Sequence, residues 1–190
     1  MTRILARHAA YALFGAALSL SATAHAQKVK LTTSAGDIVI ELDAAKAPKS
    51  VDNFLQYVNA RHYNGTVFHR VIASFMIQGG GMTADMKEKT TRAPIPLESK
   101  NGLGNARGTV AMARTNDPNS ATAQFFINVK DNDRLNAANA PDGNGYAVFG
   151  KVVSGMDVVD RIRDVPTGSK GPYSDVPNAP VMINKATVEK

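Results

Sequence analysis

The stretch FHRVIASFMIQGG, residues 68–80, lies within a segment that contains two runs rich in β-branched and aromatic residues. These runs, Thr66 to Ile72 and Phe75 to Gln78, are typical of strands, and the glycines Gly79 to Gly81 indicate a bulge or tight turn. One cation, Arg70, interrupts the apolar pattern. If Arg70 points to solvent, it is an ordinary surface residue. If it points the same way as apolar neighbours on adjacent strands, it is a fixed hydrogen-bond donor over an apolar surface.

Similar short runs precede and follow this segment, separated by Gly, Asn, Asp and Pro. They are Val29 to Thr33, Asp37 to Asp43, Thr109 to Ala113, Gln124 to Val129, Tyr146 to Val153 and Val181 to Val188, the last after a Pro-rich turn, Pro172 to Pro180. Amphipathic patterns predict two helices, one from Pro48 to near Asn64 and one around Met156 to Ile162. The chain is therefore predicted to be an all-β sandwich or barrel with two helices. Closure into a barrel would leave no long exposed edges.

Composition excludes several classes of chemistry. The chain has 190 residues, which suits one domain, and no cysteine, which rules out disulfides, thiol nucleophiles and cysteine-bound zinc. Its net charge of +6 comes from scattered basic residues, so we expect no nucleic-acid binding. The spacing of His62 and His69 fits neither one helix face nor a compact ligand pair, and no metal site is predicted.

The N-terminus has the pattern of a secretory signal peptide. Arg3 and Arg7 precede an apolar run, and Ala24-His25-Ala26 forms a cleavage site. We therefore expect residues 1–26 to be cleaved, leaving a domain of residues 27–190 with no stable membrane association. The lack of cysteine favours the bacterial periplasm.

Four ordered blocks give the chain a family resemblance. They are FHRVIASFMIQGG (68–80), VAMAR (110–114), AQFFIN (123–128) and YAVFGKVVSGMDVVDRI (146–162), and together they resemble the cyclophilin peptidyl-prolyl cis-trans isomerases. The resemblance implies an eight-stranded antiparallel closed barrel capped by two α-helices, with the substrate groove on its outer surface. It also implies an isomerase that works without a cofactor.

By motif position, the resemblance implies roles for individual residues. Arg70 corresponds to the catalytic arginine, and the substrate proline is held at Phe75, Met76, Phe126 and Leu135, with Tyr146 on the same wall. Polar positions of the groove fall at Gln78 and Gln124, and the segment that binds substrate backbone falls at Ala113, Arg114 and Thr115.

The expected function is to accelerate isomerisation of X-Pro bonds in exported proteins while they fold. The partners would be unfolded or flexible polypeptides that contain proline, and the protein is expected to be a monomer. The alternative is a peptide-binding chaperone on the same fold that does not need to catalyse.

Three positions depart from many members of this family. Arg134 stands where a tryptophan is common, Tyr146 replaces a histidine, and Arg114 replaces an asparagine. The tryptophan is associated in the family with recognition of cyclosporin, so we predict weak cyclosporin binding. Calorimetry would measure the affinity, and a nanomolar dissociation constant would contradict the prediction.

Overall fold

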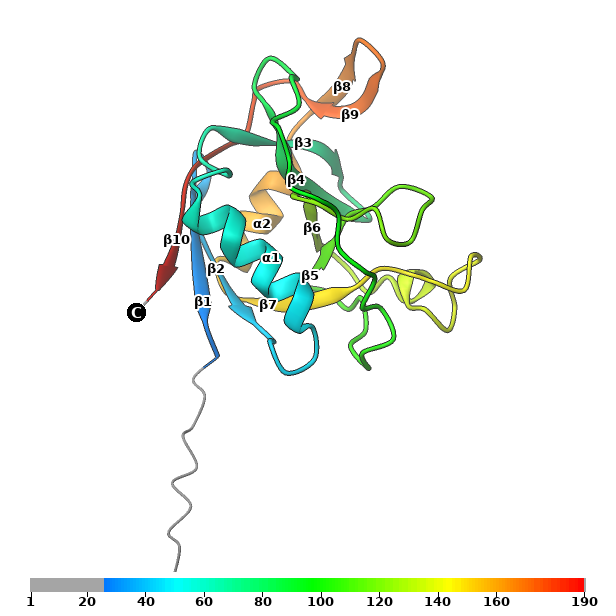
Figure 1. Ribbon diagram of the computed structural model, residues 1–190. Helices are drawn as coiled ribbons and strands as arrows, with labels where there is room; N and C mark the ends of the chain where they lie inside the picture. The colour runs from blue at the N-terminus through cyan, green and yellow to red at the C-terminus, as the bar shows by residue number, and fades with distance from the viewer. Residues whose placement is uncertain (1–25, 190) are drawn as a thin grey trace, which may run out of the picture.

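Eight antiparallel strands form the body of the molecule in the computed structural model, which describes residues 26–189. Their bounds are β1 (Lys28–Thr33), β2 (Gly36–Leu42), β3 (Thr66–Ile72), β4 (Met76–Thr83), β5 (Thr109–Met112), β6 (Phe125–Asn128), β7 (Val148–Ser154) and β10 (Met182–Glu189). They close into a barrel in the order β1-β10-β3-β4-β6-β5-β7-β2 (Figure 1). The predicted barrel is thus confirmed, whereas the predicted signal peptide lies outside the described residues apart from Ala26.

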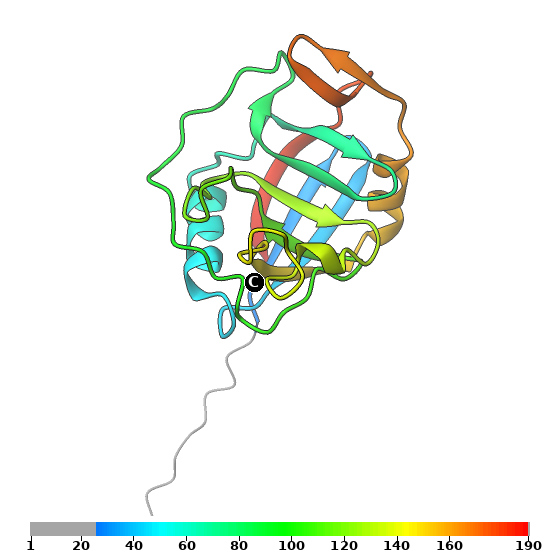
Figure 2. The same ribbon diagram turned by 90° about the vertical axis from the view of Figure 1, so that its right-hand side faces the viewer.

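Two helices lie on opposite sides of the barrel, α1 (Pro48–Asn59) and α2 (Met156–Arg163) (Figures 1 and 2). Helix α1 starts with Pro48, which fits the first turn because its missing N–H would have no helical partner. The Glu98 carboxylate accepts hydrogen bonds from the backbone N–H groups of Lys49 and Ser50, at 3.0 and 2.8 Å. A residue distant in sequence therefore caps α1. Neither helix is long and apolar enough to cross a membrane, within residues 26–189.

Aromatic side chains fill the inside of the barrel. The Phe54 ring lies 5.1 Å from those of Tyr63 and Phe149 and 5.5 Å from that of Phe125, measured between centroids. All four residues are buried, and Phe125 points inward, as expected from its place beside Phe126. Because these side chains occupy the interior, a peptide can bind only on the outside of the barrel.

Strand β4 is longer than the sequence predicts. The run of three glycines lies inside β4, which continues to Thr83, and the register with β3 shifts between Thr66 and Phe68. Gly80 has φ +88°, a conformation that glycine adopts without strain. The predicted bulge is therefore present, but it does not end the strand.

The segment expected to be a Pro-rich turn forms a second hairpin. Its strands are β8 (Thr167–Lys170) and β9 (Tyr173–Pro177), and it projects beside β3 (Figure 1). Every residue of β8 is exposed, so the strand has no alternation of buried and exposed positions. Sequence periodicity could not identify such a strand. The hairpin is held instead by Val176 and Pro177, which are buried.

Candidate active site

A row of paired residues crosses four strands on the outside of the barrel. Arg70 on β3 pairs with Gln78 on β4, Gln78 pairs with Phe126 on β6, and Phe126 pairs with Ala111 on β5. Residues paired across neighbouring strands lie on the same face of a sheet. Arg70 therefore shares the outer face with Phe126, which settles the choice that the sequence left open for this arginine.

A bulge in β3 keeps Arg70 on the outside. Phe68 and Val71 both belong to the barrel core, although residues three apart in a regular strand point to opposite faces. The register shifts between Phe68 and Arg70, which accounts for the difference. The side chain of Arg70 keeps 43% of its surface exposed, so its guanidinium is accessible to a ligand.

A second apolar cluster, which we call the outer cluster, lies on this face and is separate from the core. Its buried members are Met76, Ala111, Phe126, Leu135 and Val148, and its half-buried members are Ile72, Phe75, Leu103, Ala113 and Tyr146. Five residues predicted to hold or flank the substrate proline, Phe75, Met76, Phe126, Leu135 and Tyr146, are thus brought together. Phe126 meets the edge of Tyr146 with ring centroids 5.6 Å apart.

The two predicted polar residues lie side by side next to this cluster. Gln78 Nε2 donates a 2.9 Å hydrogen bond to Gln124 Oε1, and both side chains are half-buried. The bond fixes the amide of Gln78 beside Arg70, its partner across the strands. The pair offers polar groups at the edge of an apolar surface.

Arg114 is a structural residue of the cluster rather than a free surface cation. Its side chain is only 4% exposed, and its guanidinium lies 4.6 Å from the centre of the Tyr146 ring. Nε donates to the Gly145 carbonyl at 2.9 Å, and the other nitrogens donate to the Thr115 carbonyl and the Asp142 carboxylate. The guanidinium therefore fixes the position of Tyr146.

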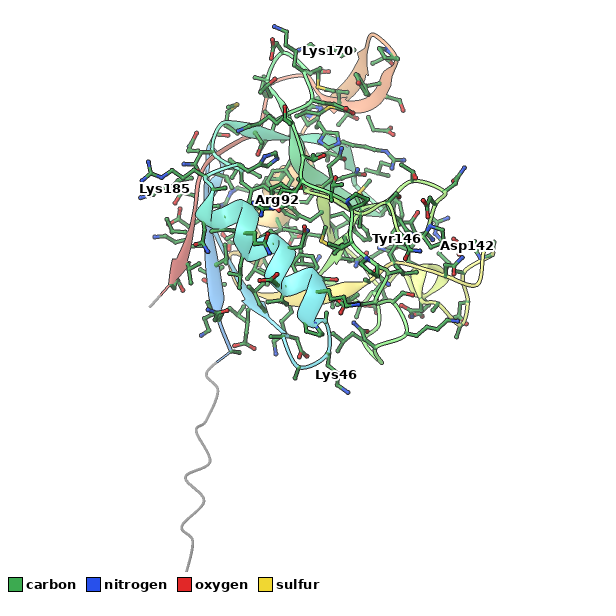
Figure 3. All side chains as sticks on the ribbon, viewed as in Figure 1. Lys46, Arg92, Asp142, Tyr146, Lys170 and Lys185 are labelled. Carbon is green, nitrogen blue, oxygen red and sulfur yellow. The ribbon has the colours of Figure 1, made fainter. Side chains whose placement is uncertain are left out.

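Asp142 lies on the same loop as Tyr146, and both side chains lie on one side of the molecule (Figure 3). The backbone N–H groups of Asn144 and Gly145, with Arg114 in addition, lower the pKa of this carboxyl from 3.8 to about 2. Asp142 is thus ionised at neutral pH, where its contact with Arg114 is an ion pair. The sequence offered no signal for this pairing.

The remaining predicted residues lie at the border of the cluster. Ala113 packs against it and donates its N–H to the Gln124 carbonyl at 3.0 Å. Thr115 is exposed, and its N–H donates to Ser120 Oγ at 2.9 Å. Arg134, which the sequence could not place, lies with its guanidinium 4.6 Å from the centre of the Phe75 ring.

Buried asparagines hold in place the connection between β6 and β7, residues 129–147, which we call the pocket loop, and sequence reasoning did not identify them. Asn132 Nδ2 donates to the Phe75 carbonyl at 2.8 Å and to Asn128 Oδ1 at 2.7 Å. The Tyr146 N–H donates to the Leu135 carbonyl at 2.9 Å. The loop that carries Leu135 and Tyr146 is therefore tied to β6 and to Phe75.

Comparison with known proteins identifies the family. Residues 28–188 match the family model described as cyclophilin type peptidyl-prolyl cis-trans isomerase/CLD. The chain is 62% identical over 161 residues to a peptidyl-prolyl cis-trans isomerase of Streptomyces antibioticus, covering 84% of this chain and 97% of that protein. It is 55% identical over 163 residues to peptidyl-prolyl cis-trans isomerase B of Escherichia coli, covering 85% and 99%.

A solved structure shows the same fold. A cyclophilin type isomerase of Cryptosporidium parvum, crystallised in the presence of the dipeptide Ala-Pro, superimposes with a TM-score of 0.71 at 26% identity, covering 86% of this chain and 99% of that one. The chain therefore belongs to the cyclophilin-type peptidyl-prolyl cis-trans isomerases. Its activity is isomerisation of the peptide bond that precedes proline.

The ionisable groups near the site are few. No group of three or more His, Asp or Glu side chains converges as a metal site within residues 26–189. His69, next to Arg70, is only 6% exposed, and its Nδ1 has no hydrogen-bond partner among the described residues. Burial lowers the pKa of His69 from 6.5 to about 4; the Arg70 charge adds to the shift, while contacts with Val67 and Gln124 oppose it.

This shift predicts a loss of stability in acid. Between pH 6.5 and about 4 the unfolded chain binds a proton at His69 that the folded protein does not bind. The free energy of unfolding should therefore fall as the pH drops through this window, by up to about 3 kcal/mol. Urea unfolding at several pH values would measure it, and the slope should be smaller in His69→Gln. An NMR titration that places the His69 pKa near 6.5 would contradict the prediction.

Proposed function

We propose that Arg70 is the catalytic residue and that the outer cluster holds the ring of the substrate proline. The observation that carries the proposal is the row that joins Arg70, Gln78 and Phe126. In this row a cation lies two strands from Phe126, with Gln78 between them, on the same outer face as an apolar surface. The side chain of proline is a small apolar ring, and an apolar surface of this kind can bind it.

The chemistry requires a donor and no bond cleavage. Resonance gives the peptide C–N bond double-bond character, so rotation about an X-Pro bond takes tens to hundreds of seconds although the isomers differ by only about 1 kcal/mol. In the twisted transition state the proline nitrogen regains its lone pair and accepts a hydrogen bond better than in either planar state. A donor at that nitrogen thus stabilises the transition state selectively.

Arg70 suits this role because its charge does not depend on pH. Arginine stays protonated throughout the range in which proteins fold, and the mechanism needs no general base. His69 is neutral above about pH 5, because burial lowers its pKa to about 4. We therefore expect that the rate of isomerisation does not change near neutral pH through protonation of a histidine.

The polar groups around the cluster would orient the substrate. Gln78 and Gln124 can contact the peptide on either side of the proline, together with the backbone around Ala113. Arg114 acts indirectly in this arrangement, because its nitrogens are already engaged by Gly145, Thr115 and Asp142. Its contribution is to hold Tyr146 against Phe126.

We further propose that the substrates are exported proteins in the periplasm. The support is the pattern of residues 1–26, in which a basic start, an apolar run and the Ala24-His25-Ala26 site follow one another. Flexible proline-containing segments of newly exported chains would be the partners of the site.

Substitution of Arg70 tests the catalytic role. We expect Arg70→Ala to lower kcat/KM for a short X-Pro peptide by about 100-fold, the usual effect of removing one transition-state donor. Arg70→Lys should also lose activity, because an ammonium cannot reproduce the planar fork. A protease-coupled assay near 5 °C would measure the rates, since the uncatalysed reaction then takes minutes.

Arg92→Ala is the matched control, because it removes an exposed arginine whose charge forms no ion pair among the described residues. It should leave kcat/KM unchanged. If Arg70→Ala stays folded and keeps the activity of the parent protein, Arg70 is not the catalytic residue.

Export is tested by fractionation. A full-length chain expressed in a Gram-negative host should be recovered from the periplasm, with Gln27 as its first residue by N-terminal sequencing. Recovery of an uncleaved chain from the cytoplasm would contradict the proposal.

A further inference from the structure

The hairpin of β8 and β9 brings a carboxylate to Arg70. Asp175 Oδ2 lies 3.7 Å from Arg70 Nε, and both side chains are about 40% exposed. No other carboxylate in residues 26–189 comes within 4.0 Å of this guanidinium. Nothing in the sequence pointed to the contact, because the two residues are far apart in the chain and the hairpin was not predicted.

The backbone at Asp175 is specialised for this placement. Its φ is +59°, in the left-handed region that few residues other than glycine, asparagine and aspartate adopt. The following residues, Val176 and Pro177, are buried and anchor β9. The buried neighbours of Asp175 and its left-handed backbone thus place this aspartate beside an arginine on β3.

Other charged groups do not compete for Asp175. Lys170, at the end of β8, donates its ammonium to the Ala84 carbonyl at 2.9 Å on the loop after β4 (Figure 3). His69 is neutral near pH 7, because burial lowers its pKa. The nearest cation to the Asp175 carboxylate is therefore Arg70.

We propose that Asp175 is a positioning residue for Arg70, an inference that rests on the catalytic role proposed for that arginine. At 3.7 Å from Nε the carboxylate is beyond hydrogen-bond distance, so it attracts one edge of the guanidinium by its charge and leaves the two terminal nitrogens free to donate to the substrate. An exposed ion pair of this kind contributes little to stability, so its effect is expected in the rate. The β8–β9 hairpin is thereby part of the active site.

Asp175→Asn is the informative substitution, because asparagine keeps the shape and tolerates the left-handed backbone while the charge is removed. We expect kcat/KM to fall about three- to fivefold, with unchanged affinity for a proline peptide measured by NMR titration. High salt, near 1 M, should narrow the difference between the two proteins, because it screens exposed charges. Asp157→Asn, which removes the exposed partner of Arg161 on α2, is the matched control and should leave kcat/KM unchanged.

A double-mutant cycle separates positioning from a structural role. In the Arg70→Ala background, Asp175→Asn should cause no further loss, because Asp175 acts through Arg70. Asp175→Gly relieves the left-handed backbone and provides a second variant that should lose activity without losing stability. An equal loss with and without Arg70 would show that the hairpin acts structurally and would overturn the inference.

The outcomes also separate this inference from the proposed function. If Arg70→Ala is fully active, the proposed role of Arg70 fails and the positioning role fails with it. If the rate depends on Arg70 but Asp175→Asn matches the parent protein, only the positioning role is overturned.

Discussion

Closure of the barrel is the constraint on which the rest of the structure depends. Eight strands that close on themselves leave no unpaired edge, and the ring of Phe54, Tyr63, Phe125 and Phe149 fills the space they enclose. Neither the interior nor an edge of the barrel is then available for a peptide. The site has to be built on the outer face, where side chains normally meet water. The bulge at His69 and Arg70 serves this purpose, because it keeps a cation on that face while Phe68 and Val71 both enter the core.

An apolar cluster on the outside of a barrel is packed on one side only, because its other side faces solvent. Other contacts must therefore hold its side chains in position. Here the support is polar. Asn132 ties the pocket loop to Phe75 and to Asn128, and Arg114 fixes Tyr146 through Gly145 and Asp142. Hydrogen bonds donated by buried side chains hold a loop in one conformation more firmly than apolar contacts alone. The outer cluster is therefore held in one arrangement before a ligand binds, which under the proposed function suits a ring that has little conformational freedom of its own.

The sequence predicted most of the barrel and most of the cluster, for identifiable reasons. Strands such as Thr66–Ile72 combine β-branched residues with clear boundaries, and the four family blocks place Arg70 and Phe126 by motif position. The β8–β9 hairpin could not be predicted, because β8 is exposed on both faces and is held by tertiary contacts. The roles of Asp142 and Asp175 were also not accessible. Each depends on tertiary contacts that bring residues distant in sequence together, and charge alone does not indicate such pairing.

Two of the departures from the family pattern, Arg114 and Arg134, make the same kind of contact with an aromatic ring. Arg114 lies over Tyr146 and Arg134 lies over Phe75, each with its guanidinium 4.6 Å from the centre of the ring. A guanidinium stacked on an aromatic face is attracted by the ring quadrupole and covers its outer side. Both rings belong to the outer cluster, so the two arginines brace it from opposite ends of the pocket loop. A bulky aromatic residue at position 134 would extend the apolar surface, whereas Arg134 ends it with a charge. The apolar surface of the outer cluster is therefore bordered by a charged group at Arg134.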